Sequence, residues 1–184
     1  MEFTNEQKLI VTLLTDIHAE LNIKNSIDPE FVQDAVCSGR AWALQWQYPG
    51  IFEGEVDTPD HVTFVVKVLE LWERLERSYA ELSDESRADV AEKAKPFGRE
   101  VTFPGFDGNG GDGDAYGTAH MLINQMGRWS SFKDRDLNSH GSTQDEYRRM
   151  LEALAELNKD HGDYYFSPDQ ITALLLSRVH PSNR

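Results

Sequence analysis

The stretch 105–117, GFDGNGGDGDAYG, holds three aspartates and one asparagine among six glycines. Oxygen ligands at alternate positions of a loop, with a glycine after the third and a carboxylate at the end, are typical of EF-hand calcium sites. A count from Asp107 puts Gly111 at the third ligand position and Thr118 at the end, and a count from Asp112 ends on Ile123. Both registers fail, so the sequence predicts no metal site.

The same loop is a poor phosphate site. Glycine amides before a helix can bind an anion, but they need a nearby cation. The segment between Arg99 and Arg128 contains no lysine or arginine, while its carboxylates repel phosphate. We therefore interpret residues 105–114 as a loose connection, with Asp114 as the N-cap of the next helix, and we expect no cofactor.

Sequence motifs of catalysis are missing. The chain lacks G-x-S-x-G, H-E-x-x-H and a phosphate-binding P-loop, and its one cysteine, Cys37, excludes an internal disulfide and a cysteine-based metal site. No catalytic residue can be assigned, and the sequence favours a protein that is not an enzyme.

The charge of the chain limits its partners. A formal net charge of −14 argues against direct binding of nucleic acid, which demands a basic surface. It leaves open a basic protein partner, including a nucleic-acid-binding protein for which this chain is an acidic decoy. No apolar run is long enough to span a membrane, and Glu2 and Glu6 stand where a signal peptide carries positive charge. We expect a cytoplasmic protein.

Apolar residues recur at helical spacing over most of the chain. Thr4 with Gln7, Asp28 with Pro29, and Ser167 with Pro168 mark helix starts. The predicted helices span about 4–21, 28–38, 40–48, 58–82, 83–95, 115–126 and 143–157, with a last one from 167.

Two short segments have the pattern of strands. REVTFPGF (99–106) alternates apolar and polar residues, and Pro104 excludes a long central strand. DYYF (163–166) is a candidate partner for it. The sequence thus predicts a mainly α fold: one domain over 1–184, a bundle of about seven helices with at most one two-stranded β element.

Several segments resemble the YfbU family: MEFTNEQKLI at the start, REVTFPGFD, MGRW at 126–129 with Phe132, HG at 140–141, and YRRMLEAL at 147–154. The resemblance implies a compact, mostly helical bacterial protein that self-associates. The family has no established biochemical activity, so no catalytic residues are implied. Residues 108–114 depart from the family in having more glycines.

The family-like segments carry four polar residues that are candidates for a ligand site: Arg99, Asp107, Arg128 and His140. Val101, Phe103, Phe106, Trp129 and Phe132 are the apolar neighbours that would anchor them to the core. If these segments meet, we expect either an ion pair that ties Asp107 to a cation and pins the loop, or a pocket lined by Arg128 and His140.

The segment AWALQWQYPGIF is rich in aromatic residues, and Trp42, Trp46 and Tyr48 are candidates for an interface. The sequence favours an interaction protein that works through a helical homo-oligomer or a partner surface. The alternatives are a small-ligand-binding protein or enzyme with the polar site above, and the acidic decoy.

Overall fold

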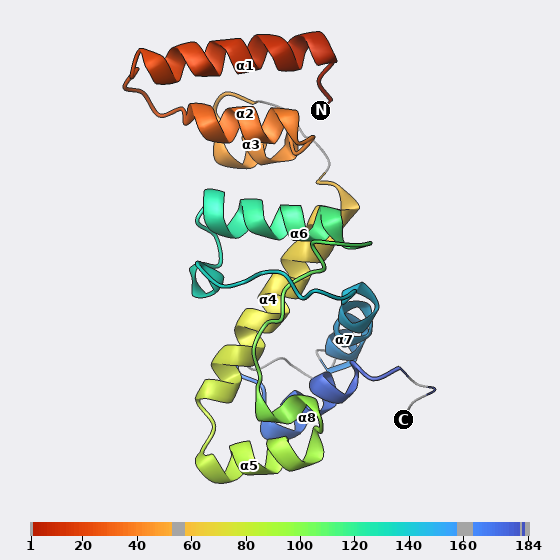
Figure 1. The fold of residues 1–184 in the computed structure, drawn as a ribbon. Coiled ribbons are helices and arrows are strands. Elements are labelled where there is room, and N and C mark those ends of the chain that lie inside the picture. Colours follow the sequence, from red (N-terminus) through yellow and green to blue (C-terminus); the bar gives the residue numbers. More distant parts are fainter. Residues whose placement is uncertain (1, 53–57, 158–163, 181, 183–184) are drawn as a thin grey trace. The chain divides into compact units, whose positions relative to one another are not determined.

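The computed structural model describes residues 2–52, 58–157, 164–180 and 182 (Figure 1). It is 62% helical, with eight α-helices and no named strand among the described residues. The prediction of a mainly α fold is therefore confirmed. Contacts divide the chain into two compact units, Met1–Asp60 and His61–Arg184, and each unit has its own set of helices.

The first unit contains α1 (Asn5–Glu20), α2 (Pro29–Cys37) and α3 (Trp42–Gln47). Thr4 and Gln7 form the predicted capping box, in which the hydroxyl of Thr4 accepts from the amide of Gln7 and the Gln7 side chain accepts from the amide of Thr4. Asp28 caps α2, with Pro29 at the first helical position. Both helix starts predicted from the sequence are therefore confirmed.

The second unit holds the remaining elements: α4 (Asp60–Ala80), α5 (Asp84–Lys93), the 3₁₀ turn η1 (Phe97–Arg99), α6 (Gly113–His120), the π-helix η2 (Met121–Gln125), the 3₁₀ turn η3 (Ser130–Phe132), α7 (Gln144–Leu157) and α8 (Pro168–Leu176). Ser83 caps α5, and Ser167 caps α8 as the sequence predicts. Because η2 follows α6 without a break, the single helix predicted at 115–126 is helical throughout but widens in its last part.

The core of the second unit is built on α4. Seven apolar side chains along α4 are buried at 0–1% exposure: Val62, Val65, Val68, Leu69, Leu71, Trp72 and Leu75. The ring of Trp72 lies 6.0 Å from the ring of Phe103 and 6.2 Å from that of Tyr147. The family-like segment VTFPGF therefore packs between α4 and α7, and it is held there by aromatic contacts.

The predicted β element has a different partner from the expected one. Among the described residues, Phe106 forms a single parallel bridge with Asn138. The described part of DYYF instead contacts α4, where the amide of Phe166 donates to the hydroxyl of Ser78 at 2.9 Å. Asp163 lies outside the described residues. The predicted pairing of the two segments is wrong because the buried hydroxyl of Ser78 accepts from the amide of Phe166, which would otherwise be free to bond a strand partner.

Candidate functional site

The family-like segment REVTFPGFD meets the residues just before His140 at the bridge between Phe106 and Asn138. The amide of Phe106 donates to the carbonyl of Leu137 at 2.9 Å, and the amide of Ser139 donates to the carbonyl of Phe106 at 3.1 Å. The side chain of Asn138 accepts from the amide of Gly108 at 3.1 Å. These bonds tie the start of the glycine loop to the segment that contains His140.

Gly105 is the tightest point of this junction. Its φ is +88°, and a Cβ placed on it would stand 2.1 Å from the carbonyl oxygen of Leu137. The Gly105 carbonyl accepts from the hydroxyl of Tyr147 at 2.6 Å and from that of Thr143 at 3.3 Å. Backbone conformation and crowding both require glycine here.

Tyr147 has a structural role at this junction. The side chain is fully buried and donates its only proton to Gly105. Burial raises the pKa of the Tyr147 phenol far above its ordinary value, because the phenolate would lose its hydration. The hydroxyl is therefore a fixed hydrogen-bond donor and is unsuited to act as a general base at neutral pH.

Asn109 contacts both Asp107 and His140. A carboxylate oxygen of Asp107 accepts from the amide of Asn109 at 2.9 Å, and the amide nitrogen of the Asn109 side chain lies 3.4 Å from Nδ1 of His140. His140 is exposed, with its Nε2 3.7 Å from a carboxylate oxygen of Asp136. No ion pair of Asp107 with a cation is found among the described residues, so its observed role is to close a local turn.

The two arginines lie elsewhere along the chain. Arg99 ends η1, which contacts α5 and α8. Arg128 is exposed, and its amide donates to the carbonyl of Leu122 at the end of the π-helix. Within the described part of the chain, no hydrogen bond or ion pair joins either arginine to Asp107 or His140. The ligand site made of all four residues stays a prediction.

The apolar neighbours of these residues are largely buried. Phe106 and Phe132 are at 0% exposure, Val101 and Phe103 are at 5%, and the rings of Phe103 and Phe132 lie 5.1 Å apart. Trp129 is half-buried, with a left-handed φ of 46°. The anchors that the sequence suggested are thus mostly core residues, and they hold the family-like segments in place.

Asp112 is the aspartate of the loop that sequence analysis missed. It is 2% exposed, and its carboxylate accepts from the amide of Thr143 at 2.8 Å and from the hydroxyl of Ser142 at 3.1 Å. It thereby stabilises the start of α7. The prediction that Asp114 caps α6 is wrong. The helix begins at Gly113, so its N-cap residue is Asp112, and the Asp112 side chain makes no capping hydrogen bond to α6.

No group of three or more histidines, cysteines, aspartates or glutamates that could hold a metal ion is found among the described residues. The carboxylate of Asp107 accepts from the amide of Asn109 in the loop, and that of Asp112 accepts from the amide of Thr143 just before α7. The glycine loop is therefore pinned at two points.

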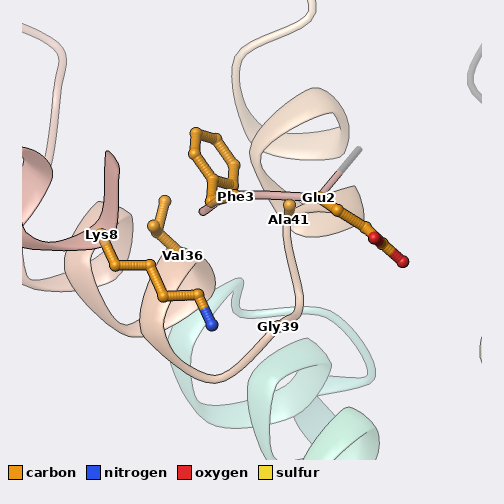
Figure 2. Close-up of a pocket in the computed structure, with 6 residues that line it drawn as sticks. All are labelled: Glu2, Phe3, Lys8, Val36, Gly39 and Ala41. Atoms are coloured by element: carbon orange, nitrogen blue, oxygen red, sulfur yellow. The ribbon is translucent and has the colours of Figure 1, made fainter. Parts of the chain in front are cut away.

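Two surface pockets formed by described residues are lined by none of the four candidate site residues. One of about 190 Å³ lies beside α4 and Tyr164. The other, of about 280 Å³, lies at the start of α1 and is lined by Glu2, Phe3, Lys8, Val36, Gly39 and Ala41. Figure 2 shows the carboxylate of Glu2 pointing away from the ammonium group of Lys8. The charged groups of this pocket do not converge on one point, as a specific polar ligand would require.

The aromatic interface candidates make contacts inside the first unit. Trp42 is buried and its ring lies 5.4 Å from that of Trp46, which is half-buried. The hydroxyl of Tyr48 accepts from the amide of Asp28, and its ring lies 5.9 Å from that of Phe31. Their role in an interface stays a prediction.

Among the described residues of the first unit, most of the exposed large apolar side chains lie on α1. We define the α1 apolar face as its six outward-facing side chains, which are 53–66% exposed: Leu9, Ile10, Leu13, Leu14, Ile17 and Leu21. The side of α1 that contacts α2 is more polar: the hydroxyl of Thr15 lies 2.9 Å from the side-chain oxygen of Gln33, and that of Thr12 lies 3.6 Å from the sulfur of Cys37. The helical spacing of these six residues predicts the helix over 4–21, but it does not say whether they face the protein or the solvent.

The helical fold, the aromatic core around VTFPGF and the pinned loop define a mainly α protein in which the family-like segment VTFPGF lies in the interior. The family model described as the YfbU domain matches residues 1–176. The chain belongs to the YfbU family. Comparison with curated proteins gives no match.

Proposed function

We propose that this chain is an interaction protein that docks another protein on the α1 apolar face, and that its activity is binding rather than catalysis. The observation that carries the proposal is the exposure of six large apolar side chains on one side of one helix. Contiguous apolar patches of this kind are rare on proteins that act alone, and they mark interaction sites.

The energetics favour a partner that is itself apolar. Full burial of a leucine or isoleucine side chain contributes about 1.5–3 kcal/mol, so covering these half-exposed six would contribute roughly 5–10 kcal/mol. Association costs roughly 4–15 kcal/mol in lost freedom of motion. The α1 apolar face offsets this cost fully only when the partner buries a comparable apolar surface of its own.

The charges around the face favour a protein over a lipid surface. Helices that lie on membranes are rich in lysine and arginine on their polar side. Here Glu6, Asp16 and Glu20 are exposed, whereas the helix's one lysine, Lys8, is half-buried. In the part of the chain that the structure describes, no helix is both long and apolar enough to cross a bilayer. We propose a cytoplasmic location for the protein.

Photo-crosslinking in the cell of origin tests the proposal. A benzophenone amino acid replaces Leu14 in the full chain, and a matched version carries it at Ala19, an exposed position of α1 outside the apolar face. We expect a discrete covalent adduct with a protein from position 14 and a much weaker one from position 19. Equal labelling from both positions, or no protein adduct from position 14, would reject the proposal.

A further inference from the structure

We infer that the partner of the α1 apolar face is a basic amphipathic helix of a different protein, with lysine or arginine along an edge of its apolar side. This inference rests on the proposed function and names the chemistry of its partner. It is carried by the placement of the acidic residues of α1, by the contacts of the nearby basic residues and by the shape of the face.

The acidic residues of α1 lie along one edge of the apolar face. Leu9 and Leu13 form this edge, and steps of three and four residues continue the same line of the helix to three exposed carboxylates, which we call the acidic row: Glu6, Asp16 and Glu20. A helix that covers the apolar face therefore brings one of its own edges against a row of negative charges.

The basic residues near the acidic row are turned elsewhere. Lys8 lies on the side of α1 that contacts α2, where it lines a pocket together with a residue of α2 (Figure 2). Nε2 of His18 lies 3.2 Å from the side-chain oxygen of Asn25. The ammonium group of Lys24 donates to the side chain of Asn22 at 2.6 Å. In the described part of the chain no ion pair neutralises the acidic row, so the cation that complements it must come from a partner.

The end of α1 adds to the negative charge of the row. The helix ends at Glu20, and the last carbonyl groups of a helix carry the negative end of its dipole. A glutamate at this end is unfavourable by itself, because negative charge meets negative charge. A lysine or arginine of the partner placed beside Asp16 and Glu20 is attracted by the carboxylates and by the carbonyl groups together.

The shape of the face matches a single helix. From Leu9 to Leu21 it extends about 18 Å along the axis, at 1.5 Å per residue. Steps of four and three residues alternate along its centre, from Ile10 to Leu14, Ile17 and Leu21. Two helices interlock their side chains with this repeat, whereas a strand presents every second residue and does not match it. Because the face is only one helix wide, the contact is small, and ion pairs at its edge must add to the apolar centre.

The first test measures the binding of labelled synthetic peptides to the purified full chain by fluorescence anisotropy. The basic peptide has the 16-residue length of α1, leucines at steps of three and four residues, and lysines along both edges of the leucine stripe. One control peptide replaces each lysine by glutamate, and another keeps the composition but scrambles the order. We expect the basic peptide to bind at least about tenfold more tightly than either control, and to lose at least about threefold in affinity between about 0.05 and 0.5 M salt.

Variants of the chain locate this binding. Asp16→Asn together with Glu20→Gln should weaken binding of the basic peptide by about fivefold, because each exposed ion pair contributes modestly. Glu30→Gln together with Glu85→Gln removes the same charge from exposed positions outside α1 and should change the affinity by less than about twofold. Leu14→Glu adds a negative charge but removes an apolar contact, so it should weaken binding by about tenfold or more. Because Leu14 is 59% exposed, this replacement should leave the helical circular dichroism intact.

The second test examines the partner in the cell of origin. The photo-crosslinked adduct from position 14 is digested, and the joined segment is sequenced by mass spectrometry. We expect a segment of a different protein that carries apolar residues at steps of three and four, with lysine or arginine beside them.

The outcomes separate the inference from the proposed function. Equal affinity for the basic and acidic peptides, no binding of the basic peptide, or tighter binding after Leu14→Glu would each overturn the basic helix. So would an adduct of the chain with its own copy. If the adduct is a different protein whose joined segment lacks lysine and arginine, the proposed function stands and the basic helix is excluded. If no protein adduct forms from position 14, both are rejected.

Discussion

Gly105→Ala is expected to lower the free energy of unfolding by about 3–5 kcal/mol, enough to leave much of the protein unfolded. The left-handed backbone at Gly105 is strained for alanine, and the new methyl group would overlap the carbonyl of Leu137. The backbone must therefore shift, which also disturbs the bond from Tyr147 to the Gly105 carbonyl. Urea unfolding followed by circular dichroism measures the effect.

Gly111→Ala is the matched control for this prediction. It lies in the same glycine-rich loop, but a Cβ there meets nothing within 4 Å and its φ is not in the left-handed region. We expect a change within about 0.5 kcal/mol. Equal stability of the two variants would contradict the tight approach of Gly105 to Leu137.

Asp112→Ala should cost about 2–4 kcal/mol, more than the loss of either of the other two aspartates of the loop. Its buried carboxylate accepts from the backbone of Thr143 and from the hydroxyl of Ser142, both just before α7. Removal would leave the buried amide of Thr143 without its partner. Chemical denaturation of the variant measures the loss, and Asp112→Asn, which keeps an acceptor oxygen, should recover part of it.

Asp114→Ala and Asp107→Ala are the controls for Asp112. Asp114 is exposed in the first turn of α6, so its loss removes a weak interaction with the helix dipole, worth about 0.3–1 kcal/mol. Asp107 closes a turn on Asn109, and its removal should cost about 1 kcal/mol. A larger loss from Asp107 than from Asp112 would mean that the loop is held at Asp107 instead.

Much of the fold was predictable from local sequence signals. Helix starts at Thr4, Asp28, Ser83 and Ser167 depend on a side chain that bonds an amide two or three residues away, and such pairs are visible in the sequence. The burial of apolar residues along α4 was also predictable, because their helical spacing in the sequence matches the side of the helix that is buried.

The candidate site was harder to predict because its contacts are distant in sequence. Asp112 bonds Thr143, which is 31 residues away, and no local pattern distinguishes it from Asp114. Asp114 has the better local signal, since it stands in the first turn of a helix, but the structure gives the buried role to Asp112. The choice between them is made by the packing of α7 against the loop.

The direction of the α1 apolar face was also beyond sequence reasoning. An apolar stripe on an amphipathic helix predicts burial, whereas here Thr15 faces α2 and Leu14 faces outward. Helical period identifies a face but not its partner. That mismatch between pattern and burial is the basis of the proposed function.

Side-chain footprinting with hydroxyl radicals tests most directly whether another protein covers the α1 apolar face. The reactivity of Leu13, Leu14 and Ile17 is compared between intact cells and the dilute purified protein, with exposed Ile51 and Tyr164 as internal references. We predict that the three α1 side chains react at least about threefold more slowly in cells, because a docked partner excludes water from them. The reactivity of the two reference side chains should change little. Equal reactivity of the α1 side chains in cells and in dilute solution would contradict the account.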